Sequence, residues 1–306
     1  MLAKGILLLS ACFAFVFCSP RHTVCPNDTT YIDTTQETNN ANIDSLLIVN
    51  GEWLIDSLDG FVLKRVQFDN KECLGSNQYV CILEIAPESP RRLAFTYEPR
   101  RTPTSTHAKR NNAIAAINGS FFDMKYHNPI CYLRIDGKEK GINTPQKSDS
   151  INRKYYQYGS MKLEKGRPVF FIPDSGRFAE RLLADSNIMT AGPLLIYHGK
   201  LIPMRDDKEF VTNRHNRTAI GTKKDGTVLL VTIDGRMKLS EGMSLMDFQK
   251  LLYYLGCEDA LNLDGGGSTT MYVKGFEHSG IVNHPTDNGK YDFKGERDVS
   301  NCVIIK

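Results

Sequence analysis

The chain has 306 residues, of which 41% are hydrophobic and 24% are charged. It is therefore long and apolar enough to bury a sizeable core as one large domain or two small ones. Its 38 basic and 35 acidic residues give a net charge of +3, a balance that argues against nucleic acid or an anionic membrane surface as the partner.

The N-terminus has the layout of an export signal. Lys4 precedes an apolar run that ends at Cys18, and a charge followed by such a run is typical of exported proteins. Within it, "LSAC" resembles a bacterial lipobox that would attach a lipid to Cys12, whereas a simple signal peptide would be cut near Ser19. We therefore expect residues 1–18 to direct export to the periplasm, the medium or, through the lipid, the cell envelope.

Residues 19–42 are rich in Thr, Asn, Asp and Pro. Such a segment buries little apolar area, so we expect a flexible tether. The folded domain is then residues 43–306.

The first part of that domain is predicted to be mainly strands. Residues 45–96 contain "GFVLKRVQF" and "YVCILEIA", whose β-branched and aromatic runs are bounded by turn residues. Residues 104–112 suit a short capped helix. Residues 113–117 suit a buried strand that leads into Asn118-Gly119-Ser120.

The second part alternates strands and turns. Residues 188–202 are predicted as strand, turn and strand, and the polar residues 204–216 as a loop. Residues 217–221 and 228–233 should form paired strands joined by a turn at Lys224-Asp225-Gly226.

One helix has clear end signals. Ser244 with Asp247 three residues later resembles a capping box, apolar residues follow at helical spacing, and Gly256 is a natural stop. Residues 260–263 then form a strand that ends in "DGGGS".

The eight cysteines show no spacing typical of a zinc site. Cys73 and Cys81 flank a turn-like "LGSNQY", so they could form a hairpin disulfide in an exported protein, or could be free buried thiols. Cys257 and Cys302 are predicted core residues.

The stretch from Asp264 to Ser268 carries the strongest chemical signal. Three consecutive glycines leave no Cβ atoms in the way, so their amides could form a nest for an anion. Asp264 would instead act as a general acid or base, bind a sugar hydroxyl or hold a cation. The alternative is a glycine-rich turn with a capping Asp.

Three further strand ends carry polar residues of the same kind. They are Asn118-Gly119-Ser120, His215-Asn216-Arg217 and Asp234-Gly235-Arg236. Arginine binds phosphate oxygens with two prongs, while carboxylates do the proton work in glycosidic cleavage. The combination fits a substrate with both a phosphate and a sugar.

At this point the chain resembles the phosphodiester glycosidase family. "AINGSFF", "AGPLLI", "RTAIG", "VTIDGR", "GMSLMDFQKLLYYLGCEDALNLDGGGSTTMY" and "GERDVSNCVII" occur in the family's order over residues 50–306. Ser120 stands where the family usually has a second glycine, and Asn216 stands where it often has a proline. The chain looks like an exported bacterial relative.

The resemblance implies an α+β fold with a mixed β-sheet core and packed helices in a single catalytic domain. It also implies hydrolysis of a sugar-1-phosphodiester to free sugar and phosphomonoester. The candidate bases or nucleophiles are Asp264, Asp234 and Glu296. The expected substrate- and phosphate-binding residues are Asn118, Gly119, Arg217, Arg236, Gly265, Gly266, Gly267, Ser268, Thr269 and Arg297.

Other functions stay open. The same residues could serve a phosphodiesterase that cuts the P–O bond, or a non-catalytic envelope lipoprotein that binds an anionic glycan. We expect no cofactor, although Asp264, Asp234 and Glu296 could hold Ca²⁺ or Mg²⁺ in a metal-dependent version. The expected partner is a phosphorylated glycan or glycosyl phosphodiester, with membrane attachment through an N-terminal lipid.

Overall fold

The computed structural model describes residues 43–145, 153–174, 176–204 and 209–306. The predicted export signal and tether, residues 1–42, lie outside the described residues. Strands make up 40% of the structure and helices 17%. The expected α+β class therefore holds in outline, with sheets dominant.

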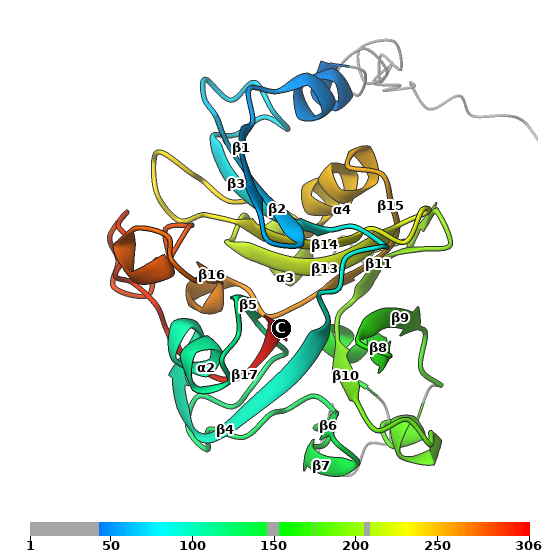
Figure 1. The fold of residues 1–306 in the computed structure, drawn as a ribbon. Coiled ribbons are helices and arrows are strands. Elements are labelled where there is room, and N and C mark those ends of the chain that lie inside the picture. Colours follow the sequence, from blue (N-terminus) through cyan, green and yellow to red (C-terminus); the bar gives the residue numbers. More distant parts are fainter. Residues whose placement is uncertain (1–42, 146–152, 175, 205–208) are drawn as a thin grey trace, which may run out of the picture.

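The strands form three sheets (Figure 1). The eight-stranded sheet has the order β1 (Leu54–Leu58), β2 (Phe61–Phe68), β3 (Gln78–Ile85), β14 (Val228–Ile233), β13 (Arg217–Lys223), β15 (Cys257–Asn262), β11 (Leu194–Tyr197), β12 (Lys200–Leu201). The five-stranded sheet has the order β7 (Lys138–Gly141), β6 (Leu133–Ile135), β10 (Ile188–Ala191), β8 (Gly159–Glu164), β9 (Arg167–Phe171). The four-stranded sheet has the order β16 (Met271–Val273), β5 (Ala115–Asn118), β17 (Asp298–Ile305), β4 (Leu93–Pro103).

The ladders between these described strands are all antiparallel, so the expectation of a mixed sheet is wrong. The predicted pairing of β13 with β14 is confirmed, with Arg217 opposite Ile233. Short turns connect several neighbours, and such turns join antiparallel strands without a crossover helix.

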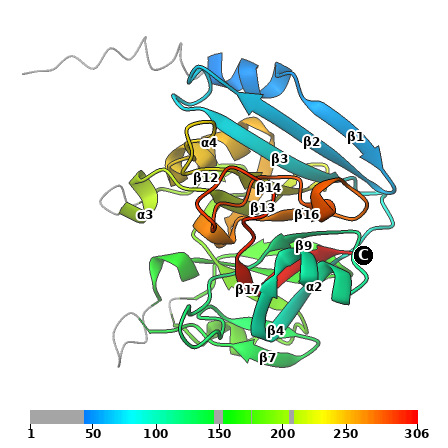
Figure 2. The ribbon, with the colours of Figure 1, turned by 90° about the vertical axis from the view of Figure 1, so that its left-hand side faces the viewer.

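The central strands of the eight-stranded sheet are buried on both faces. Along β3, Cys81 and Leu83 point into a core shared with the other two sheets, whereas Val80 and Ile82 point into a second core. Figure 2 shows the sheets stacked as layers around the first core. The alternation follows from the two-residue period of a strand, and it explains why these strands are continuous apolar runs.

Helix α4 (Leu245–Tyr254) covers the outer face of this sheet (Figure 1). Its predicted cap is confirmed, because the Ser244 hydroxyl accepts the Asp247 amide at 3.0 Å. The buried Phe248, Leu251 and Leu252 pack into the second core. Helix α2 (Thr104–Arg110) packs beside β4 and β17, but the residue at its N-cap position, Pro103, gives no side-chain cap.

Two segments differ from the predicted elements. Residues 43–50 are helical and not strand-like, because a short apolar run does not distinguish the two. Ile48 of this helix packs into the second core, and Asp44 accepts the amide of Leu74 at 2.8 Å. The predicted loop at 204–216 contains the short helix α3 (Glu209–Thr212), with Val211 buried.

The hairpin disulfide is not formed. Cys73 and Cys81 are both free and buried, and they lie in different cores on opposite faces of the eight-stranded sheet. Cys257 and Cys302 are core residues, as expected. Among the described residues, no helix is long and apolar enough to cross a membrane.

We expect the helix at residues 43–50 to mark the N-terminal limit of the stable domain. A chain that begins at Ile43 should unfold within a few degrees of the full chain. A chain that begins at Trp53 loses the buried Ile48 side chain, which contributes roughly 1.5–3 kcal/mol, so its melting temperature should fall by several degrees. Thermal melts of both chains check this; equal melting temperatures would contradict it.

Candidate active site

The four motif regions meet at the loop after β15. The amide of Asp264 donates to the carbonyl of Gly119 at 3.1 Å, and the amide of Gly266 donates to the carbonyl of Asn216 at 2.9 Å. Arg236, from the loop after β14, lies against Gly266. Three strand ends therefore surround Asp264.

Each of the three glycines makes room for a different neighbour. A Cβ atom on Gly265 would lie 2.6 Å from the Asn216 carbonyl oxygen, and one on Gly266 would lie 2.7 Å from an Arg236 guanidinium nitrogen. A Cβ atom on Gly267 would collide with Arg297. The consecutive bare backbones thus let two arginines pack directly on the loop.

Most amides of this loop already have hydrogen-bond acceptors within the protein and are not free to bind an anion. The Gly265 amide bonds the Asp264 carboxyl, and the Gly266 amide bonds Asn216. The amides of Ser268 and Thr269 donate to carbonyls within the loop itself. Of the three glycine amides expected to form a nest, those of Gly265 and Gly266 are thus already bonded within the protein, and the positive charge at the site comes from the arginines.

Of the three predicted catalytic carboxyls, that of Asp264 has the fewest hydrogen-bond partners among the described residues. It is partly buried, and burial raises its pKa from 3.8 to about 6, although Ser268, Arg297, the Gly265 amide and Arg236 favour the charged form. The buried Ser268 hydroxyl is near, yet it makes no hydrogen bond of good geometry within the described residues. A carboxyl with this pKa can exchange a proton near neutral pH.

Arg236 and Arg297 bring positive charge to the carboxyl. The Arg236 side chain is exposed and has no hydrogen bond or ion pair to any described residue, and its backbone has φ of 64°. That left-handed conformation is uncommon outside glycine and is concentrated at functional sites. Arg297 donates through Nε to Asp287 at 2.8 Å, which fixes its guanidinium over Gly267.

Asp234 is fully buried and committed to other partners. One carboxylate oxygen accepts Asn283 Nδ2 at 2.8 Å, and the other accepts the His284 amide at 2.8 Å. His284 Nδ1 lies 2.9 Å from this second oxygen, and its ring stacks on Tyr291. Burial raises the pKa of Asp234, which these partners oppose. The structure thus gives Asp234 the geometry of a residue that orients His284.

Glu296 is hydrogen-bonded to the start of α2. Its carboxylate accepts the Ser105 amide at 2.9 Å and the Ser105 hydroxyl at 2.6 Å. It therefore occupies the first turn of α2, where negative charge is favourable and where Pro103 provides no cap. Burial raises its pKa. In this structure Glu296 stabilises a helix end and makes no contact with the glycine loop.

Three predicted binding residues are buried supports. Asn118 donates to the Asp264 carbonyl at 2.7 Å and accepts the Thr218 hydroxyl at 2.9 Å. Thr269 is fully buried beside Thr218. Arg217 donates from Nε to the Met243 carbonyl at 2.9 Å, and burial lowers its pKa to about 10. These residues shape the site from behind.

The two departures from the family pattern have local partners. The amide of Ser120 donates to Asn301 Oδ1 at 2.7 Å, and its hydroxyl donates to the same atom at 3.2 Å. Its side chain is thus held away from the loop. Asn216 supplies the carbonyl that Gly266 bonds, so a residue with an ordinary backbone serves here.

Some residues of the site were not predicted. Asp287 lies in a polar turn without a spacing signal, yet it holds Arg297. His215 lies beside Arg217 and Arg236, and burial followed by these two charges lowers its pKa, so it is neutral near pH 7. Its Nδ1 is buried without a partner among the described residues. The only sequence signal for His215 was its place in the polar segment that precedes β13.

The three carboxylates do not form a metal site. Asp234 and Glu296 have the partners given above, and no group of three or more His, Cys, Asp or Glu side chains that could hold an ion occurs within the described residues. The arrangement in which Asp264, Asp234 and Glu296 bind Ca²⁺ or Mg²⁺ together is therefore wrong.

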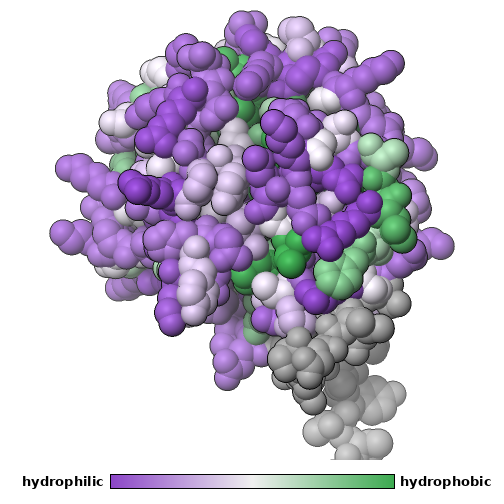
Figure 3. All heavy atoms as spheres, turned by 90° about the horizontal axis from the view of Figure 1, so that it is seen from below, coloured by the Kyte–Doolittle hydropathy of each residue, from purple (hydrophilic) through white to green (hydrophobic). Residues whose placement is uncertain are grey.

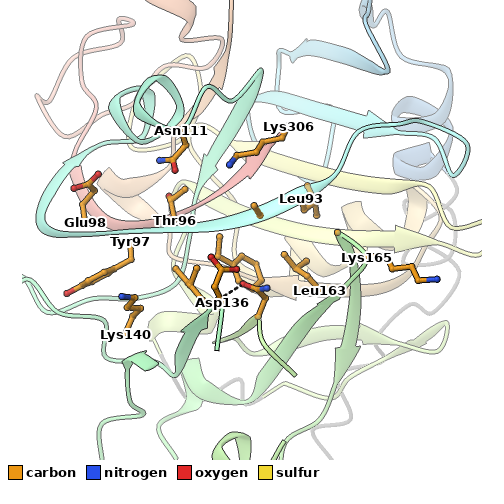
Figure 4. Close-up of a pocket in the computed structure, with 15 residues that line it drawn as sticks. Leu93, Thr96, Tyr97, Glu98, Asn111, Asp136, Lys140, Leu163, Lys165 and Lys306 are labelled. Carbon is orange, nitrogen blue, oxygen red and sulfur yellow. Dashed lines mark hydrogen bonds between the residues drawn. The ribbon is translucent and has the colours of Figure 1, made fainter. Parts of the chain in front are cut away.

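A cavity of about 550 Å³ lies elsewhere, between β4 and the β6–β7 hairpin (Figure 4). Lys140, Lys306 and Tyr97 line it, and none of the predicted site residues does. This lower side of the molecule is mostly hydrophilic, with small apolar patches (Figure 3). The cavity is thus separate from the loop around Asp264.

The raised pKa of Asp264 predicts a specific pH dependence of stability. The folded protein holds this proton more tightly than the unfolded chain, so the group stabilises the fold fully below about pH 4 and loses that effect as the pH rises to about 6. Relative to Asp264→Asn, the wild type should lose about 2 kcal/mol across this window. Urea unfolding of both proteins measures the difference; a constant difference would contradict the raised pKa.

Arg217 and Arg236 should respond differently to replacement by lysine. Arg217→Lys alters a buried side chain and removes its hydrogen bonds to three carbonyls, those of Met243, Phe210 and Asn213, and should cost about 2–4 kcal/mol of stability. Arg236→Lys, which alters an exposed side chain without partners in the described structure, should change stability by less than about 0.5 kcal/mol. Chemical denaturation of both variants provides the test, and similar losses would refute it.

Comparison with known proteins gives a consistent result. The sequence model of the phosphodiester glycosidase family matches residues 111–306. The SPbeta prophage-derived uncharacterized protein YomE of Bacillus subtilis is 28% identical over 206 residues, which cover 60% of this chain and 30% of that protein. Mouse N-acetylglucosamine-1-phosphodiester alpha-N-acetylglucosaminidase is 34% identical over 97 residues, which cover 32% of this chain and 18% of the enzyme.

The fold has the same relatives. The catalytic domain of zebrafish N-acetylglucosamine-1-phosphodiester alpha-N-acetylglucosaminidase, auto-inhibited by its pro-peptide, aligns with a TM-score of 0.61 at 20% identity, covering 83% of this chain and 87% of that one. The chain spans less than a third of the length of the two curated relatives above. Because the family model covers more than half of the chain, and the glycine loop lies within it, this protein belongs to the phosphodiester glycosidase family.

Proposed function

We propose that this protein hydrolyses a sugar-1-phosphodiester to a free sugar and a phosphomonoester. The observation that carries the proposal is the partly buried Asp264 carboxyl, with a pKa of about 6, beside the Arg236 guanidinium, which has no hydrogen bond or ion pair to a described residue. A carboxyl and an arginine in contact with the same loop suit one group that loses a proton and one that holds an anion. Family membership supports the same reaction class.

The residues suggest a division of labour. Arg236 and Arg297 would hold the phosphodiester and stabilise charge that develops on the leaving phosphate. Asp264, mainly ionised at neutral pH, would act as base towards water or as nucleophile at the anomeric carbon. Asp234 orients His284, and Asn118 and Arg217 fix the loops. None of these three contacts the reacting atoms in this scheme.

The proposed bond changes balance. The oxygen of water forms a bond to the anomeric carbon, and the bond between that carbon and the phosphate oxygen breaks. The electron pair stays on the phosphate, and the proton from water passes through Asp264 to solvent. Phosphate is already a fair leaving group, so strong acid assistance is unnecessary.

The substrate and location are part of the proposal. The vertebrate relatives act, by their names, on an N-acetylglucosamine-1-phosphodiester, so a phosphorylated glycan with such a linkage is the first candidate. The apolar run before residue 19 supports export to the envelope or medium, with Cys12 as the lipid attachment point.

Asp264→Asn should reduce release of free sugar from a sugar-1-phosphodiester by about 10²–10⁴-fold, because it removes the proton acceptor while keeping the shape. The matched control is Asp225→Asn, which alters an exposed turn carboxylate far along the β13–β14 hairpin and should act like the wild type. Both are assayed at temperatures where the melts show folded protein. If Asp264→Asn is as active as the wild type, Asp264 has no catalytic role and the loop is only a structural turn.

The same assay in isotopically labelled water separates the two hydrolases. Label in the released sugar means C–O cleavage, as proposed. Label in the phosphate means P–O cleavage, the rival reaction. Wild-type protein that binds a phosphorylated glycan but releases neither product would support the non-catalytic envelope module instead.

A further inference from the structure

Three aromatic side chains gather beside the glycine loop from segments far apart in sequence. Phe121 follows β5, Tyr156 lies in the 3-10 turn η1 (Tyr155–Gln157), and Phe210 lies in α3. The ring centroids of Phe121 and Tyr156 are 5.0 Å apart, and those of Phe121 and Phe210 are 6.1 Å apart. We call these three residues the aromatic cluster.

The cluster is linked to the glycine loop through neighbouring residues. Gly119, two residues before Phe121, accepts the Asp264 amide. Arg217 donates to the Phe210 carbonyl at 3.1 Å, and its guanidinium carbon lies 5.6 Å from the centre of the Phe210 ring. The buried Cys131 thiol contacts the Tyr156 carbonyl at 3.7 Å. These links place the cluster on the Arg217 side of the loop.

The cluster differs from core aromatic residues in its exposure. Phe121, Tyr156 and Phe210 are each only partly buried, whereas Phe248 in the core is fully buried. Partly exposed rings that touch one another across three segments gain less from burial than core rings do. Their arrangement therefore offers flat apolar faces to a ligand.

The backbone beneath each ring is firmly held. Arg153 and Glu180 form a buried ion pair at 2.7 Å, and Arg153 Nη1 also donates to the carbonyl of Gln157, the last residue of η1. Ser120, next to Phe121, is bonded to Asn301. α3 is bonded to Arg217 through its Phe210 carbonyl. A platform that is already fixed loses little entropy when a ligand binds.

From this geometry we propose that the aromatic cluster binds the sugar ring of the substrate, while Arg236 and Arg297 bind its phosphate. The inference rests on the proposed function and deepens it. One face of a pyranose ring presents C–H groups, which pack on aromatic rings, whereas the phosphate needs the guanidinium groups. Asp264 then lies between the two parts of the substrate, where the glycosidic bond is.

The test uses Tyr156→Ala and Phe210→Ala in the full chain, with the methyl ester of N-acetylglucosamine 1-phosphate as substrate. Each variant should raise KM about tenfold or more, with a smaller change in kcat, because a ring that contacts the ground state and the transition state alike is removed. Inhibition by inorganic phosphate, which has no sugar, should be unchanged. An unchanged KM in folded variants, or an equal loss of phosphate inhibition, overturns the proposal.

Two further variants control for structure. Phe178→Ala removes a partly exposed ring that packs on Arg177 and Arg181 instead, and it should leave KM as in the wild type. Phe210→Leu keeps apolar packing but lacks a flat ring face. If Phe210→Ala does not fold, Phe210→Leu and Tyr156→Ala decide the matter: raised KM supports the proposal, and wild-type KM overturns it.

Inactive wild-type protein would refute the proposed function but not the cluster. In that case, binding of methyl N-acetylglucosaminide is followed by saturation-transfer NMR. Transfer to the sugar ring protons that weakens in Tyr156→Ala, and not in Phe178→Ala, supports the aromatic platform. No transfer to the sugar in the wild type, or equal transfer in all variants, overturns it.

Discussion

The site depends on three consecutive residues that have no side chain. A single Cβ atom at Gly265, Gly266 or Gly267 would collide with Asn216, Arg236 or Arg297 respectively. The loop is therefore a surface on which neighbouring strand ends pack, and Asp264 is the residue that this packing surrounds. The glycines make room for the arginines, but most amides of the loop are hydrogen-bonded within the protein. The positive charge at the site therefore comes from the side chains of Arg236 and Arg297 and not from the main chain.

The three acidic side chains predicted for the site have three different environments. Asp264 keeps a partly buried carboxyl whose neighbours are cationic, whereas Asp234 is fully buried with His284 and Asn283. The Glu296 carboxylate accepts a hydrogen bond from a backbone amide at the start of α2. Environments that differ this much separate chemical roles in one fold. The catalytic proposal consequently requires one carboxyl and two supporting arginines, and it needs no pair of carboxyls.

Local signals in the sequence were enough to predict α4, the β13–β14 hairpin and the position of the "DGGGS" loop at a strand end. They were not enough for Glu296 and Arg297, because tertiary contacts send these adjacent residues to different places, one to α2 and the other to Gly267. The role of the glycines was missed for a similar reason: what approaches a backbone is decided by distant segments. Asp287 and the aromatic cluster, which depend only on tertiary contacts, gave no periodic signal.

The buried cysteines have a practical consequence. Burial raises the pKa of every described thiol, from Cys73 to Cys302, so the reactive thiolate is scarce and shielded in the native state. Alkylation of these residues must then wait for the surrounding structure to open. Since the Cys131 thiol contacts the Tyr156 carbonyl, its rate of alkylation reports how often the structure around the aromatic cluster opens, and mass spectrometry can measure that rate without any substrate.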